Sequence, residues 1–128
     1  MTTESRLVAS GSIVFAAEDN LTVEKKTEII EIGDKYSVLG LFLLVVEKPV
    51  ENTAGDLTVN VYSLIKIDGT NERDVLHTSL LLQKITDAAT YEACPIQGLF
   101  VGGGKARLGC KFAVDSGAIT VYYKLYSL

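Results

Sequence analysis

The sequence predicts an all-β fold, an antiparallel β-sandwich or jelly roll of about eight strands. Residues 57–67 alternate between apolar and polar side chains, as a half-buried strand does. Other short segments are apolar and rich in β-branched residues, and turns containing glycine and aspartate, such as Asp68-Gly69, separate them. This spacing of short strands and turns favours a sandwich or barrel over a helical fold.

The length of the chain fits one such domain. The chain has 128 residues, of which 48% are hydrophobic and 22% are charged, and chains of this size can bury a core without disulfides or metals. We therefore predict a single β-sandwich domain over residues 1–128, in which residues 1–6 form a mobile N-terminal arm.

Three strands are expected in the first part of the chain. Residues 7–15 form the first, and Gly11 in its middle predicts a bulge or a break. Residues 21–32 are ambiguous because Glu and Lys favour a helix, but their β-branched residues favour a strand. Residues 36–46 end in a continuous apolar run, which predicts a strand that is buried on both faces.

The second part begins with strand 57–67, whose expected partner is strand 75–84. Strand 91–101 contains Pro95, which confines it to a sheet edge or a bulge. Strands 105–114 and 118–125 follow after glycine-containing turns, so the last three strands are expected to form a meander. On the last two strands, alternate side chains are expected to face the core: Ala106, Leu108, Cys110, Phe112, Ile119, Val121, Tyr123 and Leu125.

The charge of the chain argues against a nucleic-acid partner. The net charge is −4, whereas a protein that contacts the phosphate backbone is normally basic. The charge is unevenly distributed, since residues 97–128 contain four bases and Asp115 as their one acid. Two interpretations stay open: a mixed surface divided by chance, or a molecule with an acidic face and a basic face suited to lattice contacts.

No segment of the sequence predicts secretion or membrane insertion. The first residues lack the apolar core of a signal peptide. The longest apolar run, Val38–Val46, is far shorter than the roughly 20 residues that span a bilayer. The expected location is therefore the cytoplasm, with no membrane contact.

No motif predicts catalysis, a cofactor or a metal ion. The glycines at 102–104 precede Lys105, but the Ser or Thr and the helix of a phosphate-binding loop are missing, so a tight turn is expected. His77 is the one histidine, and Ser79 on the same strand would point parallel to it rather than form a relay. The loop carboxylates lack calcium-site spacing, which favours solvated turns.

Cys94 and Cys110 flank the glycine turn on strands that are expected to pair. The simplest register places the two thiols diagonally on one face, farther apart than a relaxed disulfide prefers, whereas a shifted register would place them opposite each other. Two reduced, buried thiols are the expectation in the cytosol, and a disulfide is the alternative.

The candidate contact surface lies on the outward positions of the last strands. Tyr122 and Tyr126 alternate with core positions, and tyrosine is enriched at interfaces, although such a patch could also stack on sugars or bases. The basic residues of the neighbouring strand also point outward. We therefore predict a protein–protein interface formed by Lys105, Arg107, Lys111, Tyr122, Lys124 and Tyr126.

Four segments resemble small β-sandwich virion proteins of tailed bacteriophages, and capsid decoration (cement) proteins in particular. They are the apolar run 37–46, the segment Gly-Asp-Leu-Thr-Val-Asn-Val-Tyr at 55–62, Asp-Gly-Thr-Asn at 68–71, and the ending 115–125. The resemblance covers residues 21–128. It implies a jelly roll that binds a viral shell protein as a homo-oligomer, with a trimer favoured, and locks neighbouring shell subunits together.

We therefore expect a non-enzymatic structural protein of the virus particle, assembled in the host cytoplasm. Its mean hydropathy of +0.26 favours an oligomer that hides apolar surface. The alternatives are a ligand-binding sandwich, for instance for carbohydrate, and a phage tail or baseplate component. An enzyme with a loop site is the weakest hypothesis, because no nucleophile, base or metal cage is evident.

Overall fold

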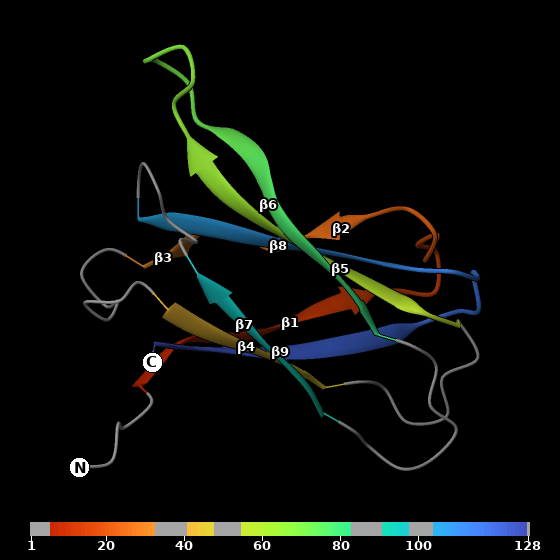
Figure 1. Ribbon diagram of the computed structural model, residues 1–128. Coiled ribbons are helices and arrows are strands. Elements are labelled where there is room, and N and C mark those ends of the chain that lie inside the picture. The colour runs from red at the N-terminus through yellow and green to blue at the C-terminus, as the bar shows by residue number, and fades with distance from the viewer. Residues whose placement is uncertain (1–5, 33–40, 48–54, 83–90, 98–103, 128) are drawn as a thin grey trace, which may run out of the picture.

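The computed structural model describes residues 6–32, 41–47, 55–82, 91–97 and 104–127, with the backbone alone for 91–97. These residues form two antiparallel sheets, which Figure 1 shows as two layers. Sheet A has the strand order β1-β9-β4-β7, and sheet B has the order β2-β8-β5-β6, with β3 also paired to β8. The described part contains no helix, so the predicted all-β fold is confirmed.

Sheet A consists of β1 (Arg6–Phe15), β9 (Ile119–Ser127), β4 (Leu41–Glu47) and β7 (Tyr91–Gln97). Sheet B consists of β2 (Lys25–Lys26), β3 (Ile30–Glu31), β8 (Lys105–Phe112), β5 (Leu57–Ile65) and β6 (Arg73–Leu82).

The core lies between the inner faces of the two sheets. Phe15 of β1 meets Phe112 of β8 edge to face, with 5.5 Å between the ring centroids. Around this pair, the buried side chains follow the predicted alternation. They include Phe42, Leu44, Val46, Val121 and Leu125 of sheet A, and Leu57, Val59, Val61, Ala106, Leu108 and Cys110 of sheet B. Because the inner faces of the two sheets pack against each other, the described strands can offer a binding surface on their outer faces or at a sheet edge.

The strand predicted at 7–15 is β1, but its irregularity is not where Gly11 predicted it. The pairing with β9 shifts between Leu7 and Ala9 and then runs without a break through Gly11 to Phe15. Arg6, which the predicted N-terminal arm of residues 1–6 included, pairs with Ser127 at the start of β1. Residues 1–5 lie outside the described part.

The prediction of one strand over 21–32 was largely wrong. Residues 21–32 follow the edge of β8, but regular pairing is confined to β2 and β3. The backbone carbonyl of Leu21 accepts a hydrogen bond from the backbone N–H of Phe112. Four residues later, Lys25 pairs with Cys110, which is only two residues from Phe112. Three residues, 22–24, therefore lie opposite the single residue Lys111. This bulged stretch breaks the ladder and leaves Glu24 free to reach the outer face of sheet B.

The prediction that strand 36–46 is buried on both faces was also wrong for its described part, β4. The side chains of Phe42, Leu44 and Val46 are buried in the core, but the alternate residues are only partly buried. Residues 36–40 lie outside the described part. The apolar odd-numbered residues Leu43 and Val45 therefore form part of the outer face of sheet A.

The predicted meander of the last three strands was wrong. β7 pairs with β4 in sheet A, β8 pairs with β5 in sheet B, and β9 returns to sheet A between β1 and β4. The chain therefore crosses from one sheet to the other between β7 and β8, and again between β8 and β9. The apolar face of β8 in sheet B thereby packs against the apolar face of sheet A. Cys94 and Cys110 consequently lie in different sheets, and Cys110 is a free, buried thiol.

Two other predictions about pairing were confirmed. β5 and β6 form an antiparallel hairpin in which Leu57 pairs with Leu82. Pro95 lies in β7, which is an edge strand among those described. The alternation predicted for 57–67 holds as far as Ser63, but Leu64 is also buried, and Ile67 lies beyond the strand with 71% of its surface exposed.

Candidate functional site

The structure divides the six predicted contact residues into two groups. Lys105, Arg107 and Lys111 lie on β8 of sheet B, whereas Tyr122, Lys124 and Tyr126 lie on β9 of sheet A. Each group points away from the core, because its neighbours in the strand are buried. The two groups therefore occupy opposite outer faces of the sandwich and do not form one continuous surface.

The outer face of sheet B carries a network of polar side chains that bind one another. Its first part is centred on Glu24, whose Oε2 accepts hydrogen bonds from Asn60 Nδ2 and Tyr62 Oη, both at 2.5 Å. Ser79 donates to Asn60 Oδ1 at 2.6 Å. Glu24 reaches these partners across Gly109, where an added Cβ would lie 2.5 Å from Oε2. Burial raises the pKa of Tyr62 to about 12, and the bond to Glu24 acts in the same direction.

The second part of the network is centred on Asp74 of β6. Lys26 Nζ lies 2.9 Å from its Oδ2 and 4.5 Å from the centroid of the Tyr62 ring. Arg107 Nη1 lies 3.1 Å from the same oxygen. Burial alone would raise the pKa of Asp74, but the hydrogen bond from Lys26 and the positive charges of Arg107 and Lys26 outweigh burial, so this pKa lies below its ordinary value. We call Glu24, Lys26, Asn60, Tyr62, Asp74, Ser79 and Arg107 the sheet B network.

These contacts occupy most of the basic residues predicted for the interface on β8. Lys105 forms an ion pair with Glu72 at 2.9 Å, and Arg107 is held by Asp74. Lys111 is exposed and makes no side-chain hydrogen bond or ion pair with the residues that the structure describes. Of the three, Lys111 is therefore the residue whose charge is available to a partner.

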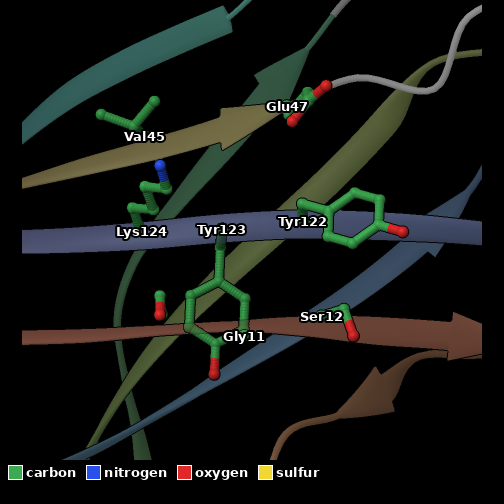
Figure 2. A pocket seen from close by; sticks show the side chains of 8 residues that line it. Gly11, Ser12, Val45, Glu47, Tyr122, Tyr123 and Lys124 are labelled. Atoms are coloured by element: carbon green, nitrogen blue, oxygen red, sulfur yellow. The ribbon is translucent and has the colours of Figure 1, made fainter.

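The outer face of sheet A has a different character. Residues paired directly across antiparallel strands point to the same face, and the register places Ser10, Lys124 and Val45 in one row. Ser12, Tyr122 and Glu47 form the adjacent row. These rows surround a hollow of about 380 Å³, which we call the sheet A hollow (Figure 2). It is lined by Ser10, Gly11, Ser12, Val45, Glu47, Tyr122, Tyr123 and Lys124.

Small residues on β1 leave the space for this hollow. The small residues Ser10, Gly11 and Ser12 pair with Lys124, Tyr123 and Tyr122 of β9. The side of the hollow formed by β1 is therefore shallower than the side formed by β9. Gly11 leaves room for the ring of Tyr123, since an added Cβ at Gly11 would lie 2.7 Å from the Tyr123 hydroxyl and would displace that side chain. Burial raises the pKa of Tyr123, with a smaller contribution from Cys110, so its hydroxyl remains a neutral hydrogen-bonding group.

Five polar side chains of the sheet A hollow have no polar partner among the described residues. Ser10, Ser12, Glu47, Tyr122 and Lys124 make no side-chain hydrogen bond or ion pair with any residue that the structure describes. Tyr122 exposes 55% of its surface, and Figure 2 shows its ring almost face-on. A hollow that combines an aromatic face with several converging polar groups is suited to reversible binding of a small polar molecule.

His77 lies on β6 of sheet B, away from the serines of the sheet A hollow. Burial raises the pKa of the Cys110 thiol to about 12, which leaves it protonated and a poor nucleophile. Within the ranges described above, no group of three or more His, Cys, Asp or Glu residues could hold a metal ion. Lys105, at the end of the glycine run, begins a strand and no helix.

Sequence reasoning found Tyr122 and Lys124 but missed Ser10, Ser12 and Glu47. The alternation along the last strand predicts that Tyr122 and Lys124 point outward. It gave no such signal for the other three residues, because a break was expected at Gly11, between Ser10 and Ser12, and Glu47 follows an apolar run without alternation. The convergence of all five residues depends on β9 lying between β1 and β4, which no local pattern reveals. Tyr126 lies one row further along β9, opposite Leu7 and Leu43, and does not line the hollow.

Comparisons with models of protein families, with curated proteins and with solved structures found no match to this chain. No helix in the described residues is long and apolar enough to cross a membrane. The fold and the two outer faces are therefore the basis for assigning a function.

Proposed function

We propose that this chain is a non-enzymatic structural protein of a virus particle, a capsid decoration protein of a tailed bacteriophage, which acts through protein–protein contacts. The sequence resemblance suggests this class, and the all-β sandwich is the fold that the resemblance implies. The observation that carries the proposal is the exposed apolar edge of sheet B.

That edge is strand β6, which pairs only with β5 among the described strands. Leu76 and Leu81 on β6 expose 56% and 62% of their surfaces. The β5–β6 hairpin extends beyond the other strands at the top of Figure 1. Edge strands are normally protected by charged side chains, proline, a β-bulge or a short length. β6 has ten residues without lysine or proline, and its pairing with β5 has one irregularity, at Val61 and Tyr62. In this proposal, a strand of a neighbouring copy covers the edge in a closed ring, with a trimer favoured.

The first test is the solution mass of the purified protein by light scattering after gel filtration. We expect a closed oligomer for the wild type and a monomer for the double variant Leu76→Lys and Leu81→Lys. Val114→Lys is the matched control, because Val114 is an apolar residue of similar exposure, 52%, away from this edge. A monomeric wild type at all concentrations would contradict the proposed ring.

The second test addresses the shell. If the chain decorates a capsid, it will co-sediment with shells of the virus that encodes it and raise the temperature at which they dissociate, because a ligand of the assembled state stabilises that state. Lys111→Glu is expected to weaken this binding without unfolding the domain. Arg107 is a poorer probe, since its substitution would break the pair with Asp74. If Lys111→Glu occupied shells as well as the wild type does, the basic face of β8 would not be part of the contact with the shell.

A further inference from the structure

We infer that the sheet A hollow is a binding site for an uncharged pyranose sugar. This inference goes beyond the proposed assembly role, because the hollow and the apolar edge belong to different sheets.

Tyr122 supplies the platform. Its ring lies on the outer face in the middle of three strands, flanked by Ser12 on β1 and Glu47 on β4. The ring is more than half exposed and presents its face (Figure 2). The C–H face of a pyranose ring can stack on an exposed aromatic face, and this contact removes apolar surface of both groups from water. The hydroxyls at the rim of such a sugar would then lie near the flanking polar side chains.

The charges around the platform select an uncharged ligand. Lys124 offers only hydrogen-bond donors, and Glu47 when ionised offers only acceptors. They lie on adjacent rows, and the structure records no ion pair between them. A sugar hydroxyl both donates and accepts, so one neutral sugar satisfies both side chains. For an acidic sugar, repulsion by Glu47 offsets attraction to Lys124, and for an amino sugar with a free ammonium, repulsion by Lys124 offsets attraction to Glu47. A charged sugar therefore gains no net charge attraction here, yet it loses more hydration free energy on binding than a neutral sugar does.

The hydroxyls of Ser10 and Ser12 complete the polar rim on β1, and each can donate or accept. The volume of about 380 Å³ is at the low end of small-molecule sites and suits one or two sugar rings. Because the hollow is walled by strands of one sheet, it is preformed, and binding requires no rearrangement of the fold.

The test is an NMR titration of the full-length chain with neutral disaccharides of glucose, galactose and N-acetylglucosamine, with glucuronate and glucosamine as charged comparators. We expect chemical-shift changes confined to residues 10–12, 45–47 and 122–124 with at least one neutral sugar, and weaker binding of both charged sugars. Shifts with none of the neutral sugars, or stronger binding of a charged sugar, would overturn the inference.

Variants separate the platform from the fold. Tyr122→Ala is expected to weaken the affinity for the neutral sugar about tenfold, whereas Tyr122→Phe keeps the ring and should retain affinity within about threefold. Lys111→Ala on the opposite sheet is the control and should bind as the wild type does. Wild-type affinity in Tyr122→Ala would overturn the inference. The oligomer mass of each variant, measured in parallel, tests the assembly proposal separately, so failure of one leaves the other standing.

Discussion

The two outer faces of the sandwich carry similar side chains but use them differently. Both have tyrosine, lysine, glutamate and serine above a pleated sheet. On sheet B these groups bind one another, since Glu24 holds Asn60 and Tyr62, and Asp74 holds Lys26 and Arg107. On sheet A, Glu47, Tyr122 and Lys124 make no such contact with described residues. Polar groups paired within the fold contribute to stability, whereas unpaired groups around a hollow are available for binding.

The cause of this difference is the chain that borders each sheet. In sheet B, the irregular stretch around β2 places Glu24 and Lys26 over β8 and β5, and Gly109 leaves room for Glu24. In sheet A, the bordering strand β1 is regular at the corresponding place and carries small residues. The stretch around β2 therefore supplies polar partners to the outer face of sheet B, whereas β1 supplies none to the described outer face of sheet A.

The largest expected effect is at Glu24. Glu24→Ala should lower the free energy of unfolding by about 2 kcal/mol, because it removes two hydrogen bonds to a carboxylate and leaves Asn60 and Tyr62 without their acceptor. Urea denaturation measures the change. The matched control is Glu47→Ala on sheet A, which should cost less than about 0.5 kcal/mol. Equal losses in the two variants would contradict the contrast between the faces.

An intermediate effect is expected at Asp74. Asp74→Asn should cost about 1 kcal/mol at neutral pH, because the carboxylate that joins Lys26 and Arg107 loses its charge. The pKa of Asp74 is lower in the folded protein than its usual 3.8, so its stabilising contribution is present above that value and disappears as the pH falls through the folded-state pKa.

Denaturation curves of the wild type and of Asp74→Asn between neutral pH and the acid range measure this effect. The difference in stability between them should shrink as the pH falls below the ordinary aspartate pKa. If the stability difference between the two proteins stayed constant down to the acid limit, the charge of Asp74 would not be the source of its stabilising effect.

The smallest effect on stability is expected on sheet A. The double variant Tyr122→Ala and Lys124→Ala should change the free energy of unfolding by less than about 0.5 kcal/mol, since neither side chain has a polar partner in the described part and both are exposed. Thermal unfolding followed by circular dichroism measures this. A loss as large as that of Glu24→Ala would show that the hollow is part of the stabilising framework.

The all-β class, most of the strand positions and the inward faces of β8 and β9 could be predicted from the sequence alone. These properties depend on side chains two residues apart on the same strand, and a local pattern records them. The prediction that Pro95 lies at a sheet edge also depends on a local property, because proline has no backbone N–H to donate to a neighbouring strand.

Which strands are neighbours could not be predicted from local patterns. The meander prediction failed because apolar strands of either sheet have the same local pattern, and their partner is chosen by packing across the core, where β7, β8 and β9 alternate between sheets. That choice separates Lys111 from Tyr122 by the thickness of the sandwich and brings Ser12 and Glu47 to either side of Tyr122. The hollow is therefore a product of strand order, because its residues are distant in sequence and meet only through backbone pairing.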